Sequence, residues 1–114
     1  MQNQEAYFND FIVKYWEKYK EAVPSIIQPH TEFTDKVYDD GELPAKMKRL
    51  IALGVALRTG CDGCIIAQTK RAIEAGATKG EVLEAVAVGI SMGGTPAAGW
   101  LWRVIKVLEE MGKW

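Results

Sequence analysis

The stretch PAKMKRLIALGVALRTGCDGCIIAQTKRAIE, residues 44–74, decides the fold of this 114-residue chain. Its first half is apolar on much of a helical circumference, which is typical of a helix at the centre of a core. Pro44 favours the first turn of that helix, and Thr59-Gly60 indicates its end. A second helix is expected over residues 64–75. The only two cysteines of the chain lie between the two patterns, in Cys61-Asp62-Gly63-Cys64.

Helical periodicity also dominates the chain before this stretch. Apolar side chains recur at steps of three and four residues from Phe8 to Tyr19, which predicts one face of a helix that Pro24 ends. From Ser25 to Asp40 the pattern is weaker. Pro29 is expected to break it, and only a short helix is expected after that proline.

The chain after this stretch is predicted to form two further helices. Gly76 is expected in the left-handed conformation that commonly ends a helix. Thr78 and Glu81 form a capping box at the start of the next helix, which is expected to continue to Ile90. After a loop with two glycines, a last helix is expected over Thr95–Met111, with the threonine as its N-cap.

No segment alternates with period two, so the sequence predicts a single all-α domain over residues 1–114, with about five to six helices. The chain has 14 basic and 15 acidic residues and a formal net charge of −1, which indicates neither a nucleic-acid partner nor an anionic membrane surface. The N-terminus lacks the features of a signal peptide, and the apolar run from Leu50 to Leu57 is too short to span a bilayer. We therefore expect a cytoplasmic protein, where a CxxC pair is kept reduced or cycles.

The CxxC pair leaves several chemical interpretations open. A closed zinc site needs four ligands, and the chain offers this pair and one histidine, His30, far away in sequence. A metal site is therefore disfavoured, and His30 is expected to be an ordinary surface or half-buried residue. A purely structural crosslink is also disfavoured, because closing so small a loop removes little chain entropy. A redox-active dithiol and two inert apolar side chains remain.

The redox interpretation has physical support from the position of the pair at a helix start. First-turn N–H groups and the helix dipole would stabilise a thiolate on Cys64, and a thiolate attacks peroxides and disulfides. Cys61 can then capture the resulting sulfenic acid as a disulfide. Gly63 keeps the turn open enough for the sulfurs to meet. Asp62 is expected to point outward and cap the helix.

An ordered set of segments around the pair is more specific than the CxxC alone. The segments are Leu50-Ile51-Ala52-Leu53, Cys61-Asp62-Gly63-Cys64, Ala75-Gly76-Ala77-Thr78-Lys79-Gly80-Glu81-Val82-Leu83-Glu84-Ala85 and Met92-Gly93-Gly94-Thr95-Pro96-Ala97. Over about residues 43–100 this set resembles the carboxymuconolactone decarboxylase family, and the CxxC places the chain with its alkyl hydroperoxidase D-like branch. Decarboxylase members of the family generally lack this CxxC, so the resemblance disfavours decarboxylation.

The resemblance implies an all-helical fold that assembles into homotrimers or homohexamers. It also implies a thiol-dependent peroxidase that reduces hydroperoxides, with its disulfide recycled by a dithiol protein of the lipoyl or thioredoxin-like kind. By position, Cys64 would be the peroxidatic cysteine that becomes a sulfenic acid, and Cys61 the resolving cysteine and proton donor. We expect no cofactor, because the sequence contains no glycine-rich phosphate loop.

Two positions depart from the family pattern CxxCxxxH and the glutamate that precedes it. Gln68 stands where the histidine is expected, and Arg49 stands where the glutamate is expected. Glutamine cannot titrate and arginine cannot act as a base, so the usual proton relay is absent. Two interpretations follow. Either Arg49 favours a thiolate by direct electrostatics, or the protein is a non-catalytic oligomeric scaffold or binding protein of the same fold.

Three tryptophans fall in the C-terminal part of the chain, at Trp100, Trp102 and Trp114. In a domain of this size they have two natural uses. They either complete the core and the packing of helices, or they form part of an interface in an oligomer.

Overall fold

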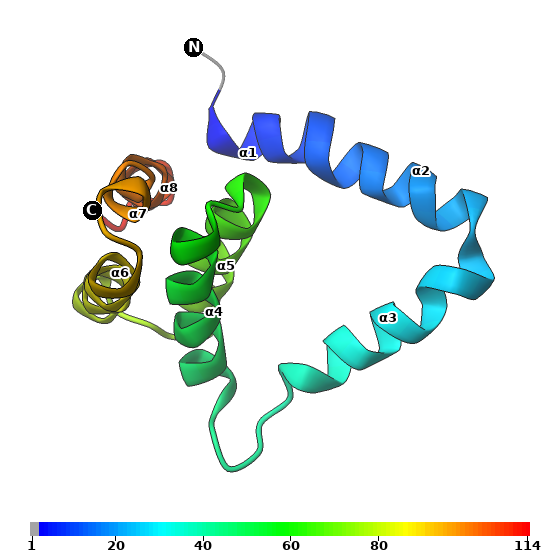
Figure 1. The fold of residues 1–114 in the computed structure, drawn as a ribbon, viewed down its shortest axis with the longest axis horizontal. Helices are drawn as coiled ribbons and strands as arrows, with labels where there is room; N and C mark the ends of the chain where they lie inside the picture. Colours follow the sequence, from blue (N-terminus) through cyan, green and yellow to red (C-terminus); the bar gives the residue numbers. More distant parts are fainter. Residues whose placement is uncertain (1–2) are drawn as a thin grey trace.

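The computed structural model describes residues 3–114, and every regular element in that range is helical, as the sequence predicted. Figure 1 shows the arrangement of these elements along the chain. The elements are α1 (Gln4–Tyr7), the π-helix η1 (Phe8–Val13), α2 (Lys14–Ala22), α3 (Pro24–Val37), α4 (Ala45–Thr59), α5 (Asp62–Glu74), α6 (Lys79–Gly93), α7 (Thr95–Ala98) and α8 (Leu101–Glu110).

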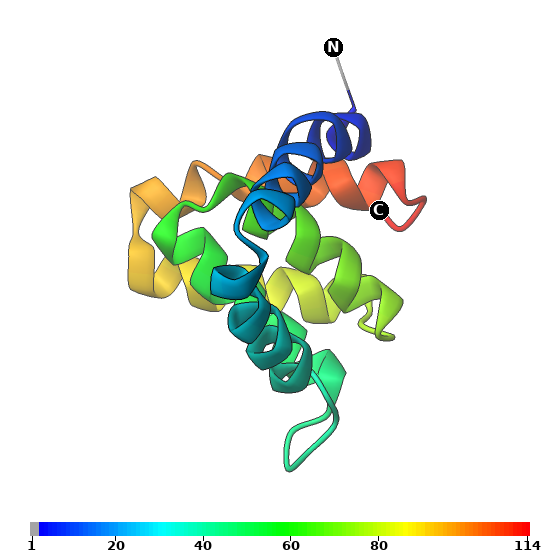
Figure 2. The same ribbon diagram turned by 90° about the vertical axis from the view of Figure 1, so that its right-hand side faces the viewer.

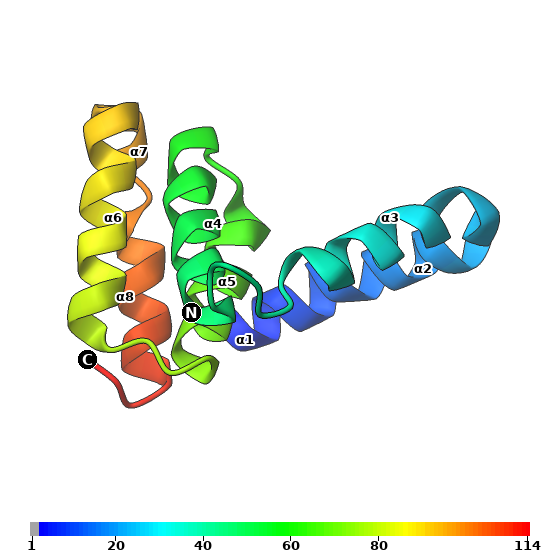
Figure 3. The same ribbon diagram turned by 90° about the horizontal axis from the view of Figure 1, so that it is seen from below.

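The helices divide into a bundle and an arm. Helices α4 to α8 pack side by side as the bundle, and α2 and α3 form a V-shaped arm that projects away from it (Figures 1 and 3). The view in Figure 2 looks at the bundle from the side of the arm. Neither α2 nor α3 contains a buried residue, whereas the bundle helices α4, α5, α6 and α8 each contribute several. The core therefore lies in the bundle, and the arm lies outside it.

The core is a single apolar cluster between α4, α5, α6 and α8. Leu53, Ile65, Val82 and Leu108 are fully buried, one from each of these helices. Such residues dominate the stability of a small domain, since each buried aliphatic side chain contributes about 1.5–3 kcal/mol. The cluster consists of Leu50, Leu53, Ala56, Leu57, Ile65, Ala72, Ala77, Val82, Val86, Ala97, Val104 and Leu108.

Two glycines allow α4 and α6 to approach each other closely. A Cβ atom on Gly89 would lie 2.9 Å from the carbonyl oxygen of Gly54 and 3.2 Å from the Cβ of Leu57, so only hydrogen fits there. The two helices run parallel. Lys46 pairs with Glu81 near their N-terminal ends, and Gly54 meets Gly89 further along in the same direction. This contact fixes α4, which carries the C-terminal end that leads into the cysteine pair.

Three of the local signals at helix ends are confirmed. Gly60 and Gly76 both have positive φ angles, 72° and 98°, as expected for residues that end helices. Thr78 and Glu81 form the predicted capping box: the threonine hydroxyl accepts from the Glu81 N–H at 3.1 Å, and the glutamate accepts from the Thr78 N–H at 2.9 Å.

The prediction that Pro29 breaks the chain into a short helix is wrong. Helix α3 begins at Pro24 and continues through Pro29 to Val37. The missing N–H of the inner proline frees only the carbonyl of Ser25, and that residue is exposed, so water can satisfy the carbonyl. The proline therefore removes one hydrogen bond without ending the helix.

The ends of the other predicted helices also need correction. The last helix is interrupted, because α7 ends before Gly99 and α8 begins at Leu101, and the N-cap of α7 is Gly94 rather than Thr95. Helix α6 continues through the expected loop as far as Gly93. These boundaries depend on packing, which a pattern of apolar residues does not report.

The aromatic face predicted along residues 8–19 is helical, but the bundle does not cover it. The segment contains η1, whose wider turns shift the register between α1 and α2. Phe11, Tyr15, Trp16 and Tyr19 remain exposed. The sequence pattern thus located an amphipathic helix correctly, while the surface that its apolar face would contact is not part of this chain's own core.

The three C-terminal tryptophans differ in burial. Trp100 is half-buried and packs against the core, whereas Trp102 and Trp114 are about half exposed, at 46% and 53%. The Lys79 ammonium lies 3.9 Å from the centre of the Trp114 ring. Among residues 3–114, no helix is both long enough and apolar enough to cross a membrane.

Replacing Gly89 by alanine tests the close contact of α4 and α6. The added methyl group has no room beside the Gly54 carbonyl, so we expect Gly89→Ala to lower the free energy of unfolding by about 1–3 kcal/mol. Gly80→Ala is the matched control, because a Cβ atom there would meet only the Thr78 hydroxyl, at 3.8 Å. That control should be neutral or stabilising by up to about 1 kcal/mol. Chemical denaturation of both variants measures the difference, and equal stability would contradict the packing argument.

Candidate functional site

The turn between α4 and α5 places the two cysteines. Helix α4 ends at Gly60, whose positive φ lets the Cys61 N–H donate to the Ala56 carbonyl at 3.1 Å. A Cβ atom on Gly60 would also lie 3.2 Å from the indole nitrogen of Trp100. Both constraints favour glycine, and together they make the next residue, Cys61, the N-cap of α5.

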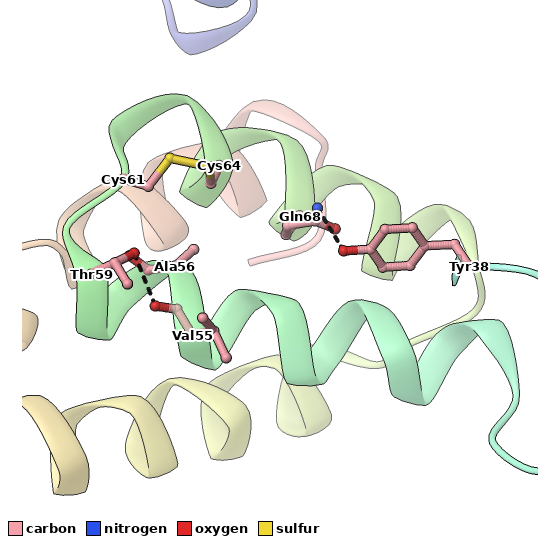
Figure 4. Close-up of a disulfide and its surroundings, with 7 residues drawn as sticks. All are labelled: Tyr38, Val55, Ala56, Thr59, Cys61, Cys64 and Gln68. Atoms are coloured by element: carbon pink, nitrogen blue, oxygen red, sulfur yellow. Dashed lines mark hydrogen bonds between the residues drawn. A yellow bond between two sulfur atoms is a disulfide. The ribbon is translucent and has the colours of Figure 1, made fainter. Parts of the chain in front are cut away.

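Helix α5 begins two residues earlier than predicted, at Asp62 rather than Cys64. Cys64 is therefore the third residue of the helix, inside the first turn, where unpaired backbone N–H groups and the helix dipole favour negative charge. The two cysteines are joined by a disulfide, and their Cα atoms are 5.2 Å apart (Figure 4). The sequence thus brings the two sulfurs together at the start of a helix.

The two cysteines differ in exposure. Cys64 is exposed and lines a pocket of about 500 Å³, whereas Cys61 is half-buried. We call this space the Cys64 pocket. It lies between α4, α5 and the C-terminal end of α3. Its apolar wall consists of Val37, Ile51, Ala52, Val55 and Ala56, and its polar lining residues are Tyr38, Lys48, Thr59 and Gln68.

The two residues at the relay positions contact each other. The Nη1 atom of Arg49 donates to the Oε1 atom of Gln68 at 3.1 Å. Gln68 lies one helical turn after Cys64 and lines the same pocket, whereas Arg49 is not one of its lining residues. Burial and the nearby Arg71 lower the pKa of Arg49 from its ordinary value, but an arginine starts from so high a value that it keeps its charge.

Tyr38 completes this group, and the sequence analysis did not assign it a role. Its ring stacks on Arg49, with the guanidinium carbon 3.5 Å from the ring centre. The Nε2 atom of Gln68 donates to the Tyr38 hydroxyl at 3.5 Å (Figure 4). The Arg49, Gln68 and Tyr38 side chains therefore form one connected polar group at the edge of the Cys64 pocket.

The expectation that Asp62 points outward and caps α5 is wrong. No side chain caps this helix, and the Asp62 carboxylate turns instead toward α1 and α8. It accepts from the Tyr7 hydroxyl at 2.6 Å and pairs with the Arg103 guanidinium at 2.5 Å and 3.2 Å. Two donors from distant parts of the chain compete better for this carboxylate than the backbone N–H groups of its own helix, because one of them is charged.

The same network holds the N-terminal segment on the bundle. Arg103 also donates to the side-chain oxygen of Gln4, which is buried. The Gln4 N–H donates to the Glu110 carboxylate at 2.8 Å and 3.1 Å. The guanidinium of Arg103 lies 4.8 Å from the ring centre of Tyr7. Helix α1 is therefore tied to α8 and to the residue between the two cysteines.

The hydrogen bond between Tyr7 and Asp62 stabilises the fold to an extent that depends on pH. The hydrogen bond to the carboxylate is the largest cause that raises the pKa of Tyr7 above its ordinary value of 10.0, with burial and the negative charge adding to it. Because the folded-state pKa is raised, the stabilisation is fully present below about pH 10 and is lost as the phenol ionises at higher pH.

Gly63 meets the N-terminal segment directly. A Cβ atom on Gly63 would lie 2.9 Å from the Cδ1 atom of Ile12, which belongs to η1. The sequence explained this glycine by the space that the sulfurs need, and the structure adds a second cause, the close approach of η1. The π-helix thus covers the turn that carries the pair, on the same side as the Tyr7 bond to Asp62.

No metal site can be built around the pair from the described residues. Among residues 3–114, no group of three or more histidine, cysteine, aspartate or glutamate side chains lies close enough together to hold an ion. His30, expected to be an ordinary surface or half-buried residue, is exposed on the arm and forms an edge contact with the Trp16 ring, with the centroids 6.1 Å apart.

The residues that sequence reasoning missed share one property. Tyr7, Tyr38 and Arg103 reach the site from 30 to 55 residues away in sequence, counted to their hydrogen-bond partners there. No local pattern marks such a residue, because its role depends on where its own helix packs. The charge of Arg103 in an amphipathic helix was a weak signal, and it does not show which residue the arginine would bind.

This geometry defines a class of protein: an all-helical bundle with a cysteine pair at the start of a central helix. The chain belongs to the carboxymuconolactone decarboxylase family, whose family profile matches residues 28–107. The resemblance found in the sequence is thereby confirmed, and the all-helical fold agrees with an alkyl hydroperoxidase D-like member.

Relatives with known sequences are similar over most of their length. An uncharacterized protein of Cupriavidus necator is 36% identical over 91 residues, which cover 80% of each chain. A protein of Paracoccus denitrificans, described as uncharacterized protein 4 of the cox locus, is 36% identical over 75 residues, 66% of this chain and 68% of that one.

Solved structures of the family have the same fold. The apo form of a carboxymuconolactone decarboxylase family protein from Legionella pneumophila superposes with a TM-score of 0.87 at 26% identity, covering 95% of this chain and 96% of the other. A Thermotoga maritima member, for which a part in an antioxidative response has been suggested, has a TM-score of 0.71 at 29% identity, over 75% of this chain and 88% of that one.

Removing the positive charge beside Asp62 tests its effect on the thiols. In the reduced protein, Arg103→Gln leaves the negative charge of Asp62 without the positive charge that now pairs with it. We therefore expect the pKa of the more acidic of the two thiols to rise by roughly 0.5–1 unit. Adding Asp62→Asn should reverse most of this rise. The ultraviolet absorbance of the thiolate against pH measures both. The control Lys18→Gln removes the same charge from the exposed arm, and an equal shift there would show that Asp62 is not the cause.

Proposed function

We propose that this protein is a thiol-dependent peroxidase and disulfide oxidoreductase that reduces hydroperoxides with Cys64 and Cys61. One observation carries the proposal: the two sulfurs are within bonding distance in the first turn of a helix, and Cys64 is open to a pocket. The suggested antioxidative part of the Thermotoga maritima relative supports the same chemistry. Decarboxylation is disfavoured, since the family members that catalyse it generally lack a CxxC.

The reaction proceeds in two balanced steps. The Cys64 thiolate attacks one oxygen of the peroxide, an S–O bond forms, the O–O bond breaks, and the departing alkoxide takes up a proton. The Cys61 thiol then attacks the sulfur of the sulfenic acid, so that the S–S bond forms and water leaves. The substrate gains two electrons and the cysteine pair loses two.

A dithiol partner is needed to complete the cycle. Thiol–disulfide exchange with a lipoyl or thioredoxin-like protein would return both cysteines to the reduced state and leave the partner oxidised. The exposure of Cys64 supports this step, because the attacking thiolate must reach a sulfur from outside. Such cycling fits a reducing compartment, and we therefore place the protein in the cytoplasm.

The shape of the Cys64 pocket supports a substrate with an apolar body. Its wall is mainly aliphatic, from Val37, Ile51 and Val55, and the polar side chains of Gln68 and Tyr38 line it as well. An alkyl hydroperoxide has this division, with one polar end and one apolar end. The polar end would then meet the sulfur and the apolar end the aliphatic wall.

A second candidate function has its own support in the relay positions. Arg49 and Gln68 replace the glutamate and histidine expected in the family, and they bond to each other rather than leave a titratable group beside the sulfurs. A scaffold that had lost catalysis could carry this pair. Such a protein would show an ordinary thiol pKa and no disulfide formation driven by hydroperoxide.

Replacing each cysteine by serine tests the proposal and assigns the two roles. With cumene hydroperoxide as substrate and dithiothreitol as reductant, Cys64→Ser should lose at least about 100-fold in turnover, because serine does not form the nucleophile at neutral pH. Cys61→Ser should still form the sulfenic acid, which a cyclic dione traps as a mass adduct.

The wild-type protein distinguishes the two candidate functions in the same assay. Peroxide-driven formation of the Cys61–Cys64 disulfide supports the peroxidase. A wild-type protein with neither turnover nor this disulfide would favour the scaffold, and unchanged turnover in Cys64→Ser would contradict the assigned nucleophile.

We also propose that the protein assembles with further copies of itself, as a homotrimer or homohexamer. The arm exposes large apolar side chains, among them Ile26 and Phe33, which are 67% and 68% exposed. The outer face of α4 and α6 forms an apolar groove of about 600 Å³. Apolar surface on this scale in a small domain is typical of an interface between subunits. The groove is lined in part by Met47, Ile51, Val55, Val88 and Met92.

A charged residue in this groove should prevent the assembly. Val88 is 64% exposed in the single chain, so Val88→Glu should cost the monomer little while burying a carboxylate in the complex. We expect light scattering to show a smaller particle for this variant. Ala87→Glu, an exposed position of α6 that does not line the groove, is the matched control. A monomeric wild-type protein, or equal masses for both variants, would contradict the proposal.

A further inference from the structure

Three side chains beside the Cys64 pocket form a chain of hydrogen bonds with a fixed direction. Arg49 can only donate, so its bond of 3.1 Å identifies the Gln68 atom that faces it as the amide oxygen. The amide nitrogen then faces Tyr38 and donates to its hydroxyl oxygen, at 3.5 Å. The guanidinium therefore donates a hydrogen bond to the amide, and the amide donates one to the phenol.

The direction of this chain leaves the proton of the Tyr38 hydroxyl free. A phenol has one proton to donate and can also accept. Gln68 uses the accepting capacity of the oxygen, and within residues 3–114 no acceptor receives the Tyr38 proton. A hydroxyl that accepts from a polarised donor is a better donor itself, because the bonds of such a chain strengthen one another.

Two other polar side chains of the pocket bond to the protein backbone. The Thr59 hydroxyl lies 3.1 Å and 3.2 Å from the carbonyl oxygens of Val55 and Ala56, to which it donates. Lys48 donates to the carbonyl of Asp39 at 2.6 Å. Both bonds turn the donor toward the protein backbone. Gln68 keeps a second amide N–H and Lys48 keeps further ammonium N–H groups, but Tyr38 is the pocket residue with a free hydroxyl proton, since no residue within 3–114 accepts it.

Tyr38 and Cys64 face the same space. Both line the pocket, and the residue that holds the tyrosine, Gln68, stands one turn after Cys64 on the same side of α5 (Figure 4). The tyrosine ring is fixed from its other side by the guanidinium of Arg49, 3.5 Å from the ring centre. Its hydroxyl is therefore positioned by two contacts before any substrate enters, which is the condition for efficient electrostatic catalysis.

We propose that Tyr38 is a catalytic residue that donates its hydroxyl proton to the oxygen that leaves when Cys64 reduces a hydroperoxide. This inference rests on the proposed peroxidase function. When the thiolate attacks the outer peroxide oxygen, the O–O bond breaks and negative charge develops on the inner oxygen. The Tyr38 proton moves to that oxygen, the product leaves as an alcohol, and the phenolate regains a proton from water.

With Tyr38 in this role, the site has a proton donor although Arg49 and Gln68 occupy the relay positions. Neither residue exchanges a proton in this reaction. The arginine orients the amide, the amide orients the phenol, and the phenol supplies the proton that the histidine of the family pattern would otherwise handle. Arg49 and Gln68 are positioning residues in this arrangement, because they act through Tyr38.

The leaving group of the oxidant provides the test. An alkyl hydroperoxide releases a strongly basic alkoxide, which needs a proton, whereas a peroxy acid releases a carboxylate, which does not. Tyr38→Phe removes only the hydroxyl and keeps the ring that stacks on Arg49. We expect its kcat/KM for cumene hydroperoxide to fall by about 100-fold, in the range typical of a lost general acid. With peracetic acid it should remain within about threefold of wild type.

Two further variants complete the experiment. Gln68→Leu removes the bond that orients the phenol, and it should show a smaller loss that is again confined to the alkyl hydroperoxide. It also keeps the proposal testable if Tyr38→Phe does not fold. Tyr19→Phe, which removes a hydroxyl from the exposed arm, is the matched control and should match wild type with both oxidants.

The outcomes separate this inference from the proposed function. Equal losses with both oxidants would mean that Tyr38 only shapes the pocket, and no loss would mean that its proton is not used; either result overturns the inference while the peroxidase function stands. A wild-type protein that reduces neither oxidant overturns the proposed function, and the inference falls with it.

Discussion

The tight turn from α4 into α5 is the constraint on which the site depends. Gly60 has a positive φ, which favours glycine, and a Cβ atom there would lie only 3.2 Å from the indole nitrogen of Trp100. The next residue, Cys61, is the N-cap residue of a new helix, and Cys64 falls within the first turn of that helix. A longer loop would separate the sulfurs from the helix dipole that favours a thiolate. The contact of Gly54 with Gly89 holds α4, and thereby the turn, in place.

Local signals in the sequence predicted the parts of the structure that local physics controls. The glycine caps, the capping box and the all-helical class all follow from backbone preferences within a few residues, and these were found correctly. The direction in which the Asp62 side chain points was not predicted, because a capping aspartate and an aspartate in a partly buried ion pair look identical in sequence. Only the packing of α1 and α8 brings Tyr7 and Arg103 to that carboxylate. The same reason applies to Tyr38, whose role depends on the end of a helix outside the bundle.

The two sides of the cysteine pair differ in their surroundings. One side is covered by protein, and the other is open to a pocket. On one side, η1 and the ion pair of Asp62 with Arg103 cover the turn and neutralise the one carboxylate between the sulfurs. On the other side, Cys64 opens onto an aliphatic pocket. A compensated carboxylate opposes a thiolate less than a free one does. The covered side therefore holds the charged groups nearest the pair, and the open side holds the pocket.

The arginine and glutamine at positions 49 and 68 are better understood as one coupled change than as two independent losses of a titratable residue. A glutamate and a histidine at positions 49 and 68 would be close enough to share a proton, because the side chains found there, Arg49 and Gln68, are in direct contact. Changing one alone would leave an arginine facing a histidine or a glutamate facing an amide. With both changed, the arginine donates to the glutamine, and the glutamine donates in turn to the Tyr38 hydroxyl. The final donor is the Tyr38 hydroxyl, and its unused proton lies on the wall of the pocket that contains Cys64.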